Sequence, residues 1–547
     1  MKTRNQEPQS STSGSGISGL DVLFLVFLTG ALFYPYIFRD QLPFPTDIIL
    51  ALQRNENIWA GKGSVDNLYT TDCVVDCYPR AYHAWTQRRE SYHPNWYPYS
   101  SCGQPNYQNP TRSPLMILGD VMNPADAYAL GMVVSVGLSG LTMLLFLWEL
   151  GVSRGARWAG AALYMLCGNS VYFLPLLHFT EATAALPLLL LAIRRLSLDG
   201  RGPDGATPLT GGYRATQGVL LAFSFAWILL SRADIAILTV ALSGSYGLYL
   251  VALRPGSRVR RLMLMAFAAT CGLGLAFFEI GPFLSVLQAS PRVQRKGSAT
   301  WNPVENLERV GITIAGAVVP DILGDPSTSS SRLPYHHKPY CGIVPLILLA
   351  FFRRGRDTSF FLAALVFCLL CGTNTPLRNL AIGLYPPLGF FDPYRCFWMT
   401  MPCMAVLFAR GIDALHDDSS SEDRGRIVIG VGALAFAGAV LILLFATPGR
   451  LEPIFQRIAA SRFEADTREY QERFDVDSRR RSYQDRWTTL RQTLLKAMVL
   501  ATLALVVLYG RRRFGTRFTL ASLLALLLVD LYPFAWRYLS GGPRSDL

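Results

Sequence analysis

Long apolar segments restrict the fold of this 547-residue chain more than any other feature. Several of them reach the roughly 20 residues that a helix needs to cross a bilayer. Only 16% of the residues are charged, whereas soluble domains carry about a quarter. We therefore predict an all-α polytopic membrane protein with about 13 transmembrane helices. The predicted spans are 17–38, 127–149, 158–175, 178–195, 216–231, 233–252, 261–288, 341–352, 358–372, 393–411, 427–446, 490–510 and 515–536.

Basic residues predict how the spans are oriented. Lys and Arg outnumber Asp and Glu by 51 to 38, which could indicate nucleic-acid binding. Cytoplasmic loops of membrane proteins, however, are themselves enriched in Lys and Arg, and this explains the excess better. A cytoplasmic N-terminus and an external C-terminus place five arginine clusters inside the cell: Arg154/Arg157, Arg194/Arg195, Arg254/Arg258/Arg260/Arg261, Arg353/Arg354/Arg356 and Arg511/Arg512/Arg513.

The spans divide the chain into alternating membrane and loop regions. Residues 1–16 are a disordered cytoplasmic N-terminus, and 17–38 are a first transmembrane helix rather than a cleaved signal peptide. Helices 2–7 follow in 127–288, helices 8–11 in 341–446, helices 12–13 in 490–536 and a tail in 537–547. Three extracytoplasmic loops remain: 39–126, 289–340 and a charged helical loop, 447–489. Loops of this length are usually functional or disordered, and the aromatic first loop is the place where we expect the active site.

The stretch "CVVDCYPRAYHAWTQRRE", residues 73–90, predicts an amphipathic helix in the first loop. Such a helix lies in the membrane interface and turns its polar side to water. The expected apolar face is formed by Val74, Tyr78, Ala81, Tyr82 and Trp85, and the expected polar face by Asp76, Arg80, His83 and Arg88. Asp72 and Asp76 are four residues apart, so both carboxylates fall on one side of the first turn. The alternative is that Asp72 only caps the helix.

Two motifs of the first loop resemble those of a known family. "TDCVVDCYPRAYHAW" and "PNWYPYSSCGQPNYQNP" are similar to the corresponding stretches of bacterial YfhO-type membrane proteins. "YCGIVPLILLAF" and "LYPPLGFFDPYRCFWMTMPCMAVLFARGIDAL" resemble later family segments, and the ordered series covers most of residues 20–415. This chain departs from the family pattern where Tyr97 replaces Asn and Asp76 replaces Gln, and it lacks the long C-terminal domain of larger relatives.

This resemblance implies a glycosyltransferase of the GT-C superfamily in the bacterial inner membrane. Such enzymes take a sugar from a polyprenyl-phosphate carrier and pass it to a glycan, lipid or protein acceptor on the outer face. The reaction needs a base for the acceptor hydroxyl and cations for the leaving phosphate. We predict Asp72, then Asp47, as the catalytic carboxylate. The predicted carrier- or substrate-binding residues are Asp76, Arg80, His83, Trp96, Asn109, His178, Glu181 and Arg395. No cofactor is predicted, and the need for a divalent cation stays open.

Other polar residues have two interpretations each. His178 and Glu181 fit equally well a site within the membrane or a position above it. Arg232 and Asp234 fit a local surface ion pair better than a functional site. The adjacent His336 and His337 lack the further ligands of a metal clamp. Cys73, Cys77 and Cys102 lie outside, where one bond from the helix to Cys102 is compatible with an oxidising compartment.

Two other functions remain compatible with the sequence. A lipid or glycolipid transporter would suit broken, proline-rich spans around a midplane site, but the chain shows no duplicated halves. A non-catalytic GT-C-like scaffold, bracing subunits of a larger membrane complex, would suit the altered motif. A cavity at Asp72 that opens to both water and bilayer would favour the enzyme.

Overall fold

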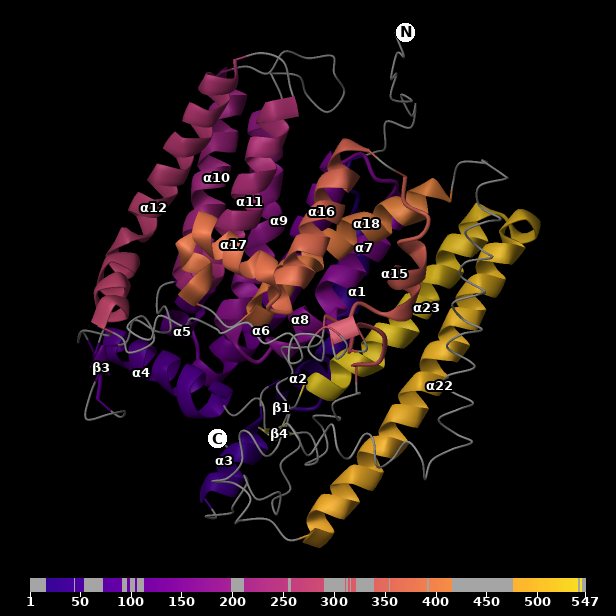
Figure 1. Ribbon diagram of the computed structural model, residues 1–547. Coiled ribbons are helices and arrows are strands. Elements are labelled where there is room, and N and C mark those ends of the chain that lie inside the picture. Colours follow the sequence, from indigo (N-terminus) through magenta and orange to yellow (C-terminus); the bar gives the residue numbers. More distant parts are fainter. Residues whose placement is uncertain are drawn as a thin grey trace.

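The computed structural model describes residues 16–43, 45–53, 72–90, 96–98, 104–105, 113–197, 211–253, 257–289, short pieces between 310 and 320, 339–353, 355–390, 393–415, 476–539 and 542–543. In these ranges the protein is a helical bundle with two short two-stranded ribbons (Figure 1). The elements before the bundle's first long helix are α1 (Gly19–Leu32), α2 (Tyr34–Phe38), β1 (Gln41–Leu42), α3 (Thr46–Gln53), η3 (Cys73–Cys77), α4 (Tyr78–Arg89), β2 (Trp96–Tyr97), β3 (Gln104–Pro105), η4 (Pro114–Ile117) and α5 (Leu118–Val121).

The bundle itself follows. Its elements are α6 (Pro124–Glu149), α7 (Arg154–Leu166), α8 (Gly168–Tyr172), α9 (Leu177–Ser197), α10 (Gly211–Ser231), α11 (Ala233–Leu253), α12 (Arg258–Ala289), α15 (Ile343–Leu348), α16 (Arg356–Gly372), α17 (Pro376–Leu384), η7 (Pro386–Phe390), η8 (Pro393–Met399), α18 (Thr400–Ala414), α22 (Val476–Phe514), α23 (Thr516–Tyr538) and β4 (Gly542–Pro543).

Seven of the described helices are long and apolar enough to cross a membrane: α6, α9, α10, α11, α12, α22 and α23. Helices α16 and α17 are long and apolar enough to cross a membrane only when they are taken together, and the chain bends by 107° between them. These helices confirm the prediction of an all-α, multi-pass membrane protein. The predicted span 427–446 lies outside the described residues, and the predicted total of 13 stays a prediction.

Burial separates the helices into an inner and an outer set. In the most apolar 18-residue segment of α9, 89% of the residues are buried inside the protein. In the corresponding segments of α12 and α22, only 28% of the residues are buried. The outer helices expose large apolar side chains such as Phe267, Phe277 and Tyr509, as expected for surfaces that face lipid. Small residues let the inner helices approach closely. At Gly160 of α7, an added Cβ would lie 3.1 Å from the Ala405 carbonyl oxygen of α18.

Ion pairs gather several of the predicted cytoplasmic arginines at one end of the bundle. Arg154 pairs with Asp21 of α1 at 2.9 Å, Arg194 with Asp357 at 2.7 Å and Arg195 with Glu149 at 2.7 Å. The start of α1, the start of α7, the end of α9 and the start of α16 therefore lie on one face. This is the grouping that the positive-inside interpretation requires. Which side of the membrane this face occupies stays a prediction.

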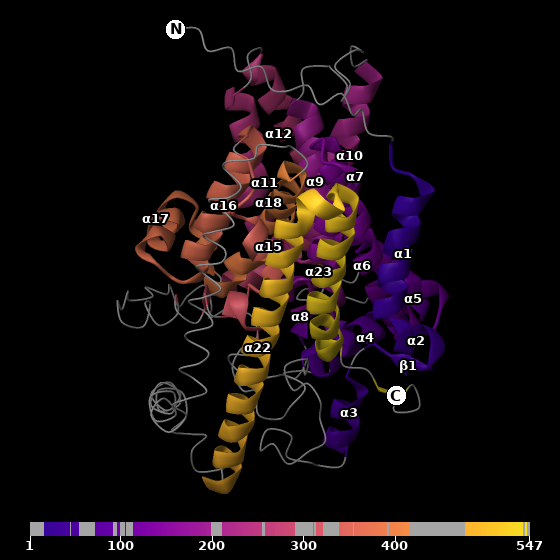
Figure 2. The ribbon, with the colours of Figure 1, turned by 90° about the vertical axis from the view of Figure 1, so that its right-hand side faces the viewer.

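The first loop and the C-terminus meet at the opposite end, at the bottom of Figures 1 and 2. Strand β1 pairs with β4, so that Gln41 lies opposite Pro543. Strand β4 therefore lies on the face that the chain reaches after α1 and α2. Residues 476–489, predicted as part of the third loop, continue α22 as one helix that projects beyond the bundle (Figure 2).

Candidate functional site

The helix predicted in the first loop exists, and it is anchored to the bundle at both ends. Its first five residues, Cys73–Cys77, form a π-helical turn that continues into α4. The Cys73 thiol donates to the Pro175 carbonyl at 3.1 Å. Burial raises the pKa of Cys73 to about 12, so the thiol keeps its proton. At the other end, the Trp85 indole donates to the Met116 carbonyl at 2.7 Å, and Arg88 pairs with Asp120 at 2.9 Å. Short π-helical insertions are frequent at functional sites.

The predicted polar face of this helix is wrong for Arg80 and His83. Arg80 and His83 are only 2% and 7% exposed, whereas Tyr82 is 50% exposed. Arg80 donates to the Asp76 carboxylate at 2.5 Å, and its guanidinium lies over the Tyr97 ring at 4.6 Å. His83 meets the same ring edge-on at 5.5 Å. These contacts provide interaction partners for the buried polar side chains. Helical periodicity alone does not predict such contacts.

Asp72 lies at the first position of this helix, but it does not cap it. Its side chain is exposed and makes no capping hydrogen bond. Desolvation by the surrounding protein, and then the charge of Asp76, raise the pKa of the Asp72 carboxyl above its ordinary value. The positive charges of Arg232 and Arg395 oppose this rise. Both arginines therefore act electrostatically on the Asp72 carboxyl.

The two arginines come from different parts of the chain. Arg232 joins α10 to α11, and Arg395 belongs to η8, just before α18. Both of them act on the charge of Asp72. The predicted site residues Asp72 and Arg395 are therefore brought together, and Arg232 joins them. The predicted local pair of Arg232 with Asp234 is not visible, because the Asp234 side chain lies outside the described residues.

The start of α9 holds Arg232 in place. Arg232 Nη1 lies 2.6 Å from His178 Nε2, so this nitrogen accepts and the imidazole proton sits on Nδ1. The guanidinium also lies over the Phe179 ring at 4.2 Å. Cation–π contacts of this kind favour arginine. His178 and Phe179 thus hold one of the two arginines that lower the pKa of Asp72.

Glu181, one turn further along α9, is fully buried. It accepts hydrogen bonds from Ser113 at 2.6 Å and from the Trp227 indole at 2.9 Å. The carboxylate therefore ties the end of the first loop to α9 and α10. This arrangement indicates a positioning residue rather than a group that touches substrate, and neither Ser113 nor Trp227 stands out in the sequence.

The structure describes the remaining predicted site residues in less detail. Asp47 is half-buried in the first turn of α3, a helix that contacts the η3 turn. Trp96 belongs to β2, which pairs with β3, but its side chain lies outside the described residues. Asn109, Cys102, His336 and His337 also lie outside them. Cys73 and Cys77 are free thiols.

The described part of the chain contains no set of ligands for a metal ion. No group of three or more His, Cys, Asp or Glu side chains there is arranged to hold an ion. The site instead combines one carboxylate, two arginines and a histidine, at the end of the bundle where the first loop packs.

Comparisons with known proteins identify no family. No family model matches the chain, and no curated protein matches it either. Among solved structures, the crystal structure of ArnT from Cupriavidus metallidurans bound to undecaprenyl phosphate is similar, with a TM-score of 0.40 and 14% identity over 90% of this chain and 76% of that one. The resemblance to YfhO-type proteins stays a prediction.

Proposed function

We propose that this protein is a membrane glycosyltransferase of the GT-C type, which moves a sugar from a polyprenyl-phosphate carrier to an acceptor on the extracytoplasmic face. The proposal is supported by the carboxylate Asp72, whose charge is influenced by Arg232 and Arg395, and by the contacts that hold Arg232 against His178 and Phe179. A carboxylate with guanidinium groups nearby can take the proton of an acceptor hydroxyl and can neutralise a leaving phosphate.

The chemistry assigns a role to each group. The acceptor hydroxyl oxygen attacks the anomeric carbon of the sugar, and Asp72 takes the hydroxyl proton. The bond between that carbon and the carrier phosphate breaks, and the phosphate leaves as an anion. Arg232 and Arg395 neutralise the leaving charge, and a guanidinium can hold two phosphate oxygens at once.

The surroundings of Asp72 support its role as the base. A general base works best when its pKa approaches the working pH, and desolvation together with Asp76 moves the pKa of Asp72 upward, in that direction. Arg80 is buried between Asp76 and Tyr97, so we assign it the positioning of Asp76 rather than contact with the phosphate. Asp47 is kept as the second carboxylate because α3 packs beside η3.

The test is release of free polyprenyl phosphate from labelled polyprenyl-phospho-hexoses by the purified protein, with and without a divalent cation. Asp72→Asn is expected to lower turnover roughly 10²- to 10⁴-fold, the usual contribution of a general base. Asp47→Asn tests the second candidate. Asp413→Asn removes a carboxylate at the other end of the bundle, where it pairs with Arg410 at 3.8 Å, and serves as the matched control. If wild type and all variants are equally inert with every donor, the scaffold function replaces this proposal.

A further inference from the structure

The short helix η8, which carries Arg395, is buried in its second half. Phe397 and Trp398 are 0% and 1% exposed, whereas Arg395 is half-buried. The Trp398 indole donates to the Thr183 hydroxyl of α9 at 3.2 Å. The Phe397 ring packs so closely on the end of α16 that a Cβ added at Gly372 would overlap it. The half of η8 that follows Arg395 is therefore embedded in the bundle.

Asn169 of α8 holds the backbone of this buried half. Its side chain is 3% exposed, and its amide donates to the Phe397 carbonyl at 2.7 Å. The Thr400 hydroxyl donates to the same carbonyl at 2.6 Å, but Thr400 begins α18, which continues directly from η8. Asn169 lies 228 residues before Phe397 in the chain. Of the two donors, Asn169 is therefore the one that ties η8 to a distant part of the bundle.

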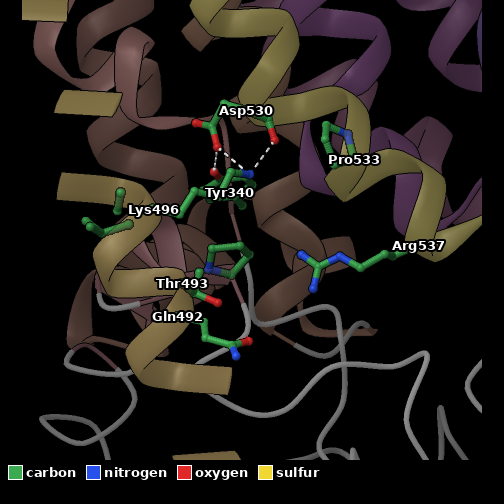
Figure 3. A pocket seen from close by; sticks show the side chains of 10 residues that line it. Tyr340, Gln492, Thr493, Lys496, Asp530, Pro533 and Arg537 are labelled. Carbon is green, nitrogen blue, oxygen red and sulfur yellow. Dashed lines mark hydrogen bonds and ion pairs between the residues drawn. The ribbon is translucent and has the colours of Figure 1, made fainter. Parts of the chain in front are cut away.

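Helix α8 is itself fixed to the last helices of the chain through Tyr340. The Gly168 backbone N–H donates to the Tyr340 carbonyl at 2.7 Å. The Tyr340 hydroxyl donates to the Asp530 carboxylate of α23 at 2.6 Å (Figure 3). Asp530 is 1% exposed, accepts from the Ile343 N–H at 2.9 Å and pairs with Lys496 at 3.1 Å. Its buried charge is thus neutralised, as buried carboxylates require, and α8 has a firm support.

We propose that Asn169 is a positioning residue of the transferase reaction, which holds the Phe397 carbonyl and so keeps Arg395 where it neutralises the leaving phosphate. Arg395 and Phe397 are two residues apart in a 3₁₀ helix, which has three residues per turn. A shift of the Phe397 carbonyl is therefore passed to Arg395 within one turn. This inference rests on the proposed function, since that function assigns the phosphate to Arg395. Asn169 itself acts through the backbone of η8.

The first measurement needs no turnover. Hydrogen–deuterium exchange of residues 393–399 is followed in the purified full-length protein and in Asn169→Ala. The variant is expected to exchange about two- to tenfold faster there, the effect of one neutral hydrogen bond. Tyr249→Phe is the matched control, because the Tyr249 hydroxyl also donates to a backbone carbonyl of another element, that of Arg356 at 2.8 Å. That contact lies at the other end of the bundle, so the control should leave η8 unchanged.

The second measurement is the pH–rate profile of polyprenyl phosphate release. Asn169→Ala is expected to lower turnover about tenfold and to move the acidic limb to higher pH, because Arg395 lowers the pKa of Asp72. A loss of folded protein alone would lower the rate at every pH and leave the limb in place. Thr400→Val removes the other donor to the same carbonyl, and it should change both readouts in the same direction but by less. It carries the test if Asn169→Ala does not fold.

Two outcomes in the variants would overturn the proposal. Unchanged exchange of residues 393–399 in Asn169→Ala and Thr400→Val would show that η8 does not depend on these bonds. Faster exchange with an unmoved pH profile, in an assay where Arg395→Gln moves it, would show that Asn169 holds η8 without positioning Arg395. A wild type that is inert with every donor is a different result, which would refute the transferase function and, with it, a role of Asn169 in that reaction.

Discussion

Gly119 is the position where one added methyl group should disturb the candidate site most. A Cβ at Gly119 would lie 2.0 Å from the Trp85 ring, which is fully buried and donates to the Met116 carbonyl. Gly119→Ala therefore forces the indole to move. Overpacking costs about 1–3 kcal/mol and the lost hydrogen bond about 0.5–1.5 kcal/mol, so we expect a loss of about 2–4 kcal/mol in folding free energy.

The same change should reach Asp72. Trp85 fixes the helix whose first residue is Asp72, and a displacement of about 1 Å at a reacting group can lower turnover up to about 10²-fold. Thermal unfolding in detergent and the release of polyprenyl phosphate measure the two effects. Gly137→Ala is the control, because its Cβ would meet its nearest neighbour at an ordinary 3.5 Å. Equal melting temperature and turnover in the two variants would refute this account of the Trp85 anchor.

Three further predictions use the same assays. Glu181→Gln places an amide where two donors converge, so it should destabilise the protein by about 1–3 kcal/mol, and an unchanged melting temperature would exclude the proposed tie. Gly342→Ala should lower stability by about 1–3 kcal/mol, because Gly342 has a φ of +87° and faces Asp530; a neutral effect in thermal unfolding would contradict this. Arg395→Gln removes a charge that lowers the pKa of Asp72, so the acidic limb of the pH–rate profile should move to higher pH. A shift to lower pH would count against Asp72 as the base.

The membrane class of this protein follows from its sequence because bilayer thickness sets helix length. The seven long helices match predicted spans, and ion pairs of Arg154, Arg194 and Arg195 bring two of the five predicted cytoplasmic clusters to one end of the bundle. Helix ends were less predictable. The last part of the predicted loop 447–489 forms the first turns of α22. Charged residues in water can continue a helix beyond the bundle as readily as they can end it.

The sequence predicts only those residues of the candidate site that lie in local motifs. Asp72 and Arg395 were singled out in separate motifs, and the fold brings them into one region. Arg232 was assigned to a local pair because its sequence neighbour is acidic, whereas its described partners, His178 and Phe179, belong to another helix. Asp530 was missed for a similar reason. Two of its partners, Tyr340 and Ile343, lie 190 and 187 residues away in the chain, and only the packing of α23 against the segment around α15 brings them together.

The raised pKa of Asp72 has a cost in folding stability, which is compatible with the base that we propose. Desolvation and the neighbouring Asp76 disfavour its charged form, so the native protein binds a proton there more tightly than the unfolded chain does. Stability contributed by this group therefore falls as the pH rises through its pKa. The positive charges of Arg232 and Arg395 offset part of this cost, and His178 lies against Arg232 at 2.6 Å. These two cations are the groups to which we assign the leaving phosphate in the proposed reaction.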